Sequence, residues 1–292
     1  MAIVRLRNQD GRPGLRIHGL DLHHLSWLCA HKSRADQALP HNVAQNVLHF
    51  LRVRSQRHSE CQSPVAATAR STYAISRNRQ LVRFGAAVCS VPANLGQVVA
   101  VTAGFYHTCA VKACGELVCF GSPGSCNVPP GLGPVAAVAA GQHHTCAVAG
   151  NGQLVCFGGN QRGQCDPPPN LGPVIAVAAG LSYTCAVKAD GELVCFGSNS
   201  HGQCTVPQDL GPVIAVAAGY AHTCALKSSG KLVCFGGNDF GQCDVPPDLD
   251  AVVAVATGPH HTCAVTAHGS LVCFGKNDLG QCLVPPDLRL DV

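Results

Sequence analysis

The sequence predicts an all-β fold, a β-propeller of about six short blades that follow a basic N-terminal leader. Two observations predict the blades. Five copies of one pattern follow one another with periods of 37 to 39 residues, and each copy carries two cysteines ten residues apart. The chain also has 32 glycines, 19 prolines and only 12% charged residues, a composition typical of short buried strands joined by tight turns. A leucine-rich solenoid would have a shorter period.

The leader, residues 1–60, lacks the repeated pattern. Val43, Val47 and Leu51 stand at helical spacing behind Asn42, a candidate N-cap. We therefore expect one short amphipathic helix in a basic leader that is mostly helical or disordered.

Charge and hydropathy exclude two classes of partner for the repeats. Residues 1–83 carry 13 Lys and Arg against 4 acids, whereas residues 84–292 carry 7 against 12, a net charge of −5. The repeat body therefore lacks the basic face that nucleic acid needs. No apolar stretch reaches the roughly 18 residues of a membrane helix, and the first residues lack the apolar core of a signal peptide. We expect a monomer without a membrane span; the compartment is left open, with the cytoplasm slightly favoured.

Each repeat predicts the same short elements. An apolar run such as residues 173–180 is a buried strand, since it is rich in β-branched residues and bounded by Pro and Gly. The segments TCAVK at 184–188 and ELVCFG at 192–197 form a hairpin. The segment GQCTVP at 202–207 is expected to be a fourth, short extended piece.

The hairpin turn that ends at Gly191 explains the cysteine spacing. A three-residue loop with glycine in the left-handed position pairs Lys188 with Glu192, which places Cys185 opposite Cys195. Opposed residues of antiparallel strands lie within disulfide reach. The candidate disulfides are Cys109–Cys119, Cys146–Cys156, Cys185–Cys195, Cys224–Cys234 and Cys263–Cys273. Their redox state depends on the compartment and stays open, because in the cytosol the same cysteines would be reduced apolar groups.

A sixth copy, residues 61–96, is a degenerate blade. Tyr73 and Arg83 replace both paired cysteines, and Arg79 replaces the turn glycine. A partnered pair is expected to be lost together in this way. The five full repeats occupy residues 97–292, and the manner in which the ring closes is left open.

The repeats share the pattern AGxxHTCAVxxxGxLVCFGxNxxGQCxVPxxL. Over about residues 64–292 this pattern resembles the regulator of chromosome condensation repeat family, with phenylalanine where that family usually has tryptophan. The short period and the Val-Pro after Gly-Gln-x also resemble the compact propeller of the streptomycete β-lactamase inhibitor proteins. The resemblance implies a propeller. It also implies two kinds of enzyme regulator, a hydrolase inhibitor or a guanine nucleotide exchange factor for a small GTPase, and, by analogy alone, a substrate-recruiting arm of a ubiquitin ligase.

The repeated histidines are expected to be structural. His107, His144, His222 and His261 precede the Thr-Cys of their copies, but Tyr183 fills the same slot in the third copy. The chain has no Cys-x-x-Cys, and no copy is unique in the way that an active site would be. We therefore expect histidines bonded to the backbone between blades, and no metal, no cofactor and no catalysis.

Two loop positions vary from copy to copy: the pair after each Ala-Gly or Thr-Gly, and the pair between Asn and Gly of the later loop. Because strands alternate in direction, both loops emerge on one face. The predicted partner-binding residues are Phe105, Tyr106, His143, Leu181, Tyr220, His260, Arg162, His201, Phe240 and Leu279. A rigid scaffold with variable, partly aromatic loops is typical of a non-enzymatic module that binds a protein partner. The alternative is that these are solvent loops without constraint.

Overall fold

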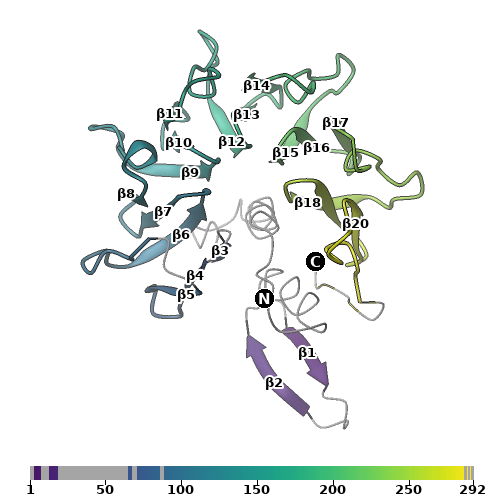
Figure 1. Ribbon diagram of the computed structural model, residues 1–292, viewed down its shortest axis with the longest axis horizontal. Coiled ribbons are helices and arrows are strands. Elements are labelled where there is room, and N and C mark those ends of the chain that lie inside the picture. Colours follow the sequence, from purple (N-terminus) through teal and green to yellow (C-terminus); the bar gives the residue numbers. More distant parts are fainter. Residues whose placement is uncertain are drawn as a thin grey trace.

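The computed structural model describes residues 3–7, 13–18, 65–67, 71–85, 89–285, 288 and 290. Within these residues the regular elements are strands, apart from one short 3-10 helix, η2 (Pro123–Ser125). Six three-stranded antiparallel sheets are arranged around a common centre, as Figure 1 shows, and each sheet is formed by one repeat. The predicted all-β propeller with six short blades is confirmed.

The three strands of each blade have fixed places, with the first of them nearest the centre (Figure 1). The inner strands are β3 (Val65–Ala67), β6 (Val98–Ala103), β9 (Val135–Ala140), β12 (Val174–Ala179), β15 (Val213–Ala218) and β18 (Val252–Thr257). The middle strands are β4 (Ser71–Ile75), β7 (His107–Lys112), β10 (His144–Ala149), β13 (Tyr183–Lys188), β16 (His222–Lys227) and β19 (His261–Thr266). The outer strands are β5 (Leu81–Gly85), β8 (Leu117–Gly121), β11 (Leu154–Gly158), β14 (Leu193–Gly197), β17 (Leu232–Gly236) and β20 (Leu271–Gly275).

The hairpin between middle and outer strands has the predicted register. The N–H of Lys188 donates to the carbonyl of Glu192 at 2.9 Å, and Gly191 has a φ of +87°. Only glycine adopts this left-handed conformation without strain. Cys185 therefore lies opposite Cys195, and the same pairing recurs in the other four full repeats.

The opposed cysteines lie with their Cα atoms 4.1 Å apart in the four pairs that are joined by disulfides. The joined pairs are Cys109–Cys119, Cys146–Cys156, Cys185–Cys195 and Cys224–Cys234. Cys263 and Cys273 share the same register but are free thiols. In that last pair, the Cys273 side chain and burial raise the pKa of Cys263 well above its usual value.

The degenerate copy has the same layout without cysteines. Tyr73 pairs with Arg83 at the register position of the disulfides, and Arg79 adopts a φ of +59° at the position of the turn glycine. The Tyr73 hydroxyl donates to the carbonyl of Cys89 at 3.2 Å. This register confirms that Tyr73 and Arg83 stand at opposed positions, as the paired cysteines do in the full repeats.

The prediction of a fourth extended piece in each repeat is wrong. Residues 202–207 form successive turns, because the N–H of Thr205 donates to the carbonyl of Gly202 at 3.0 Å and Gly202 has a φ of +77°. Cys204 and Val206 still pack against the core beneath them. These two residues therefore anchor a turn to the core.

Two strands near the N-terminus were not predicted. β1 (Ile3–Arg7) and β2 (Pro13–His18) pair as an antiparallel hairpin. The expected helix around residues 42–51 lies outside the described residues. The domain boundaries at residues 60 and 96 stay predictions.

Apolar side chains and backbone bonds join each blade to the next. Val187 of β13 packs in one cluster with Val213 and Val216 of β15. The N–H of Val213 also donates to the carbonyl of Gly191 at 2.8 Å, and the N–H of Leu290 donates to Gly269 in the same manner. The turn of one blade thus fixes where the next inner strand begins, which holds the loops of neighbouring blades side by side.

Candidate functional site

The loop face lies at the end of each blade opposite the hairpin turns. Because the three strands are antiparallel, the loop between the inner and middle strands and the segment after the outer strand emerge together. The N–H of Ser198, just after β14, donates to the carbonyl of Ser182, just before β13, at 2.9 Å. The same bond recurs in the other four full repeats, as Ser122–Tyr106, Gly159–His143, Gly237–Ala221 and Lys276–His260. We call this end of the molecule the loop face.

One group of predicted residues meets on blades two and three. The rings of Phe105 and Tyr106 are 4.6 Å apart in an edge arrangement, and the ring of Tyr106 stacks on His143 of the next blade at 5.3 Å. Tyr106 remains 44% exposed. We call these three residues the first cluster.

A second group meets on blades five and six. His260 lies 5.3 Å from the ring of Tyr220 and 5.0 Å from the ring of Phe240, which is 44% exposed. The ammonium of Lys276 lies over the Phe240 ring, 4.8 Å from its centroid. Burial and the charge of Lys276 lower the pKa of His260, so that this imidazole is neutral at physiological pH. We call Tyr220, Phe240, His260 and Lys276 the second cluster.

The other predicted residues lie in the same loops but outside both clusters. Leu279 is 61% exposed, Leu181 is half-buried, and Arg162 and His201 are exposed. Lys276 was missed by the sequence analysis. The sequence could have indicated it, because Lys276 stands directly after the outer strand, where the other full repeats have Gly or Ser.

Asn and Gln side chains hold the later loop of each blade in place. The Asn199 Oδ1 accepts from the N–H of Cys204 at 2.8 Å, and the Gln203 Oε1 accepts from the N–H of His201 at 2.9 Å. Equivalent bonds occur in three other repeats, at Asn160 and Gln164, Asn238 and Gln242, and Asn277 and Gln281. The loops therefore present their variable residues on a preorganised backbone.

The repeated histidines lie inside the propeller, between blades. His144 Nε2 is 3.0 Å from Thr184 Oγ1 of the next blade, and that hydroxyl donates its own proton to the carbonyl of Gln164 at 2.8 Å. Nε2 must therefore donate to the threonine, which leaves Nδ1 without a proton or a partner among the described residues. His107 and His222 make the same bond to Thr145 and Thr262. The Nε2 partner of these histidines is thus a threonine side chain of the next blade, which the sequence analysis did not predict.

Tyr183 fills the same slot in a different way. Its hydroxyl donates to the carbonyl of His222 at 2.5 Å, and burial raises its pKa. The slot thus accepts either an imidazole or a phenol, and the phenol hydroxyl is used in a hydrogen bond to the backbone, as expected of a packing position. Among the described residues, no group of three or more His, Cys, Asp or Glu side chains is placed to hold a metal ion.

The third-position thiols are also structural. Cys204 Sγ lies 3.3 Å from the carbonyl of Ser198, and burial raises the pKa of Cys204 to about 11. Such a thiol is almost fully protonated at neutral pH and therefore a poor nucleophile.

Of the helices in the described part of the chain, none has the length and apolar character needed to cross a membrane.

Comparisons with known proteins agree with this geometry. Five segments, residues 98–127, 135–164, 174–203, 213–242 and 252–281, match the family described as regulator of chromosome condensation (RCC1) repeat, and together they make up about half of the chain. A comparison with curated proteins finds no match.

Three solved structures show the same fold. The ectodomain of the receptor kinase CR4 from Physcomitrella patens is similar with a TM-score of 0.63 and 21% identity, over 74% of this chain and 64% of that one. Prp20p from Saccharomyces cerevisiae is similar with a TM-score of 0.62 and 19% identity, over 76% and 74%. Yeast RCC1 (Prp20) in its complex with Kap60 is similar with a TM-score of 0.64 and 17% identity, over 99% and 90%.

This chain thus spans 64% of the CR4 ectodomain, and at such identities the likeness shows the fold alone. The subtype resembling the compact β-lactamase inhibitor propeller stays a prediction. The repeat match and the propeller geometry lead to one conclusion: the chain belongs to the regulator of chromosome condensation (RCC1) repeat family.

Proposed function

We propose that the chain is a non-enzymatic module that binds a protein partner through its loop face. The observation that carries the proposal is the meeting of predicted loop residues from neighbouring blades in two aromatic clusters. Tyr106 and Phe240 each leave 44% of their surface exposed while their backbones are fixed. Exposed aromatic rings on a rigid backbone are typical of the residues that dominate binding energy at protein interfaces.

The other described residues support a binding role over catalysis. Buried histidines are used between blades, the third-position thiols have raised pKa values, and the exposed ion pairs lie on surface turns or loops. These perturbed groups thus have structural explanations. What remains on the loop face is a set of side chains that differ between repeats, which is the arrangement that recognises a large and irregular surface.

The test compares three forms of the full chain. The loop-face variant carries Tyr106→Ser, Tyr220→Ser and Phe240→Ser, and the control variant carries Asp190→Ser and Glu192→Ser on the opposite, hairpin end. Proteins captured by the wild type from the source cells are identified, and the Kd of the purified partner is measured for each form after circular dichroism shows equal folding.

The loop-face variant is expected to bind at least about 100-fold more weakly, since each ring is worth more than about 1 kcal/mol at an interface centre. The control variant should bind like the wild type. Equal affinities for the wild type and the loop-face variant would refute the proposal.

A second candidate is guanine nucleotide exchange on a small GTPase, an activity that the family resemblance implies. The supporting observation is the fold shared with Prp20p, which is described together with its binding to Gsp1p and histones. The five full repeats carry no insertion that would act as a wedge at a nucleotide site. Release of labelled GDP from a small GTPase, with and without the chain, distinguishes exchange from simple binding.

A further inference from the structure

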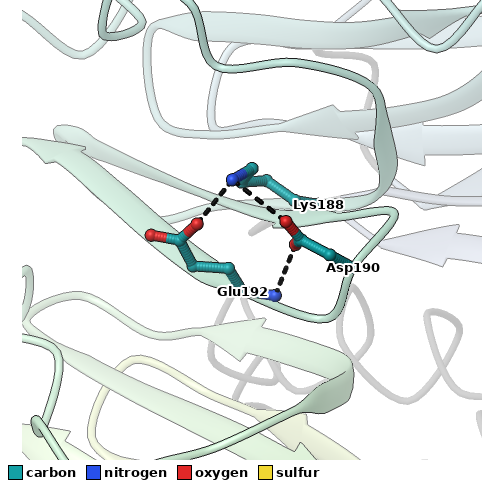
Figure 2. Close-up of polar contacts among 3 residues, drawn as sticks. All are labelled: Lys188, Asp190 and Glu192. Carbon is teal, nitrogen blue, oxygen red and sulfur yellow. Dashed lines mark hydrogen bonds and ion pairs between the residues drawn. The ribbon is translucent and has the colours of Figure 1, made fainter.

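The hairpin turns on the end opposite the loop face carry a repeated ion pair. Lys188 donates to Glu192 at 2.5 Å and to Asp190 at 3.2 Å, and the Asp190 Oδ1 also accepts from the N–H of Glu192 at 3.0 Å (Figure 2). In blade two, Lys112 pairs with Glu116 at 2.9 Å in the same manner. The turn of blade four is therefore a template in which one ammonium is held by two carboxylates.

The turn of blade five has the same backbone. The N–H of Lys227 donates to the carbonyl of Lys231 at 3.0 Å, and Gly230 has a φ of +82°, where Gly191 has +87°. Lys227 thus occupies the place of Lys188. Ser229 occupies the place of Asp190, and Lys231 that of Glu192.

These replacements reverse the charge of the turn. Lys227 and Lys231 lie at opposed positions of one hairpin, where like charges destabilise a sheet. No carboxylate of the described residues forms an ion pair with either lysine. Ser228, Ser229 and Lys231 are exposed. The turn thus carries two lysines and, between them in the sequence, a serine at the place where blade four has a carboxylate.

We propose that Ser229 is a phosphorylation site and that its phosphoryl group completes this turn as Asp190 completes the turn of blade four. A phosphoserine carries three acceptor oxygens and nearly two negative charges at pH 7. Its side chain is longer than aspartate, so that its oxygens reach Lys227 and Lys231 from the position at which Asp190 reaches Lys188. Modification changes the charge of the turn from +2 to about zero.

The chemistry requires a serine kinase and a nucleoside triphosphate. The Ser229 oxygen forms a bond to the γ-phosphorus, the bond from that phosphorus to the β–γ bridging oxygen breaks, and its electron pair leaves with the nucleoside diphosphate. A base of the kinase takes the hydroxyl proton. Lysines stand two residues before and two residues after Ser229, and charge around the acceptor residue is one feature by which kinases select substrates.

The test uses the full chain with phosphoserine incorporated at residue 229 during synthesis, and a matched control with phosphoserine at Ser228, which corresponds to Ala189 of the template. Phosphoserine at 229 is expected to raise the Tm by about 2 °C at low salt, and the gain should shrink in about 0.5 M salt. The control should gain less, and Lys227→Gln/Lys231→Gln should abolish the gain. No gain, or an equal gain in the double variant, overturns the proposal.

Two further experiments distinguish phosphate bound covalently to Ser229 from free phosphate bound at the turn. Peptide mapping of the chain isolated from its own cells with phosphatase inhibitors is expected to find phosphate on Ser229, and its absence overturns the modification. Inorganic phosphate is titrated into the unmodified protein. If free phosphate gives the same lysine-dependent rise in Tm at millimolar concentration, the turn is a site for the free anion and the proposal for Ser229 is wrong.

Discussion

Lowering the pH from 7.5 to 5.0 is expected to unfold the propeller, because four imidazoles that stay neutral in the folded state gain a proton on unfolding. Burial lowers the pKa of His144 and His222 to about 3, and that of His107 and His261 to about 4. The ordinary value is about 6.5. Because the pKa is lower in the folded state, the unfolded chain binds more protons between these values. The stability that neutral histidine contributes is complete above pH 6.5 and is lost as the pH falls.

The surroundings of these imidazoles explain why they stay neutral in the folded state. The Nδ1 atoms of His107, His144 and His222 are buried and have no hydrogen-bond partner among the described residues, so a proton there would create an unpaired charge. Each pH unit below 6.5 lowers the free energy of unfolding by about 1.4 kcal/mol per histidine, which makes about 2 kcal/mol per histidine at pH 5.0. Four histidines together lose about 8 kcal/mol, which is comparable to the entire stability of a typical domain.

Tyr183 provides the control. It shows that the slot accepts a phenol that does not titrate in this range, so the variant His107→Tyr/His222→Tyr keeps the packing and removes two of the four titrating groups. Urea unfolding is followed by circular dichroism at pH 7.5, 6.5, 5.5 and 5.0. The wild type should lose about 4 kcal/mol more than the variant between pH 7.5 and 5.0. Carboxylates titrate equally in both proteins, so an identical loss in the two would refute the reasoning.

Two further predictions concern the hairpins. Gly191→Ala is expected to lower the free energy of unfolding by about 2 to 4 kcal/mol, because a side chain strains the left-handed backbone and the new Cβ would lie 3.0 Å from the Cβ of Pro212. Gly96 has a φ of +77° but open space around it. Gly96→Ala should therefore lower the free energy of unfolding by only about 1 kcal/mol in the same urea titration. Cys185→Ser, which removes the bridge to Cys195, is expected to cost about 3 kcal/mol in oxidising buffer and much less in dithiothreitol. Equal costs within either pair of measurements would contradict the explanation.

The blade could be predicted from the sequence because its determinants are local. The left-handed glycine at residue 191 fixes the turn, and the turn fixes every opposed pair outward to Cys185 and Cys195. The period then repeats this unit. The fourth piece was mispredicted because Val206 is an apolar anchor on a turn, and an apolar residue in a short segment does not distinguish an anchored turn from a strand.

The candidate site was predictable as a set of positions but not as clusters. Antiparallel direction alone places both variable loops on one face. The stacking of Tyr106 on His143, however, joins neighbouring blades, and so do the contacts of His260 with Phe240. Such pairs depend on the angle and spacing between sheets, which no single repeat determines. Contacts between blades cannot be predicted from one repeat, and the histidines show this as well. They were expected to bond to the backbone, whereas the acceptor for His144 is the side chain of Thr184 in the next blade.

Comparison of the repeats with one another separates folding from recognition. Positions that stay constant each have a partner in the fold: the turn glycine carries the left-handed backbone, and the loop Asn and Gln hold backbone N–H groups. Where a constant position does change, as at Tyr183, a new hydrogen bond restores the contact between blades. The loop residues change without such compensation, and several of them contact one another instead. The fold does not require these residues, yet it holds them on a rigid backbone beside other aromatic rings. They are therefore free to be selected for a partner, and this is the physical reason for proposing that the function lies on the loop face.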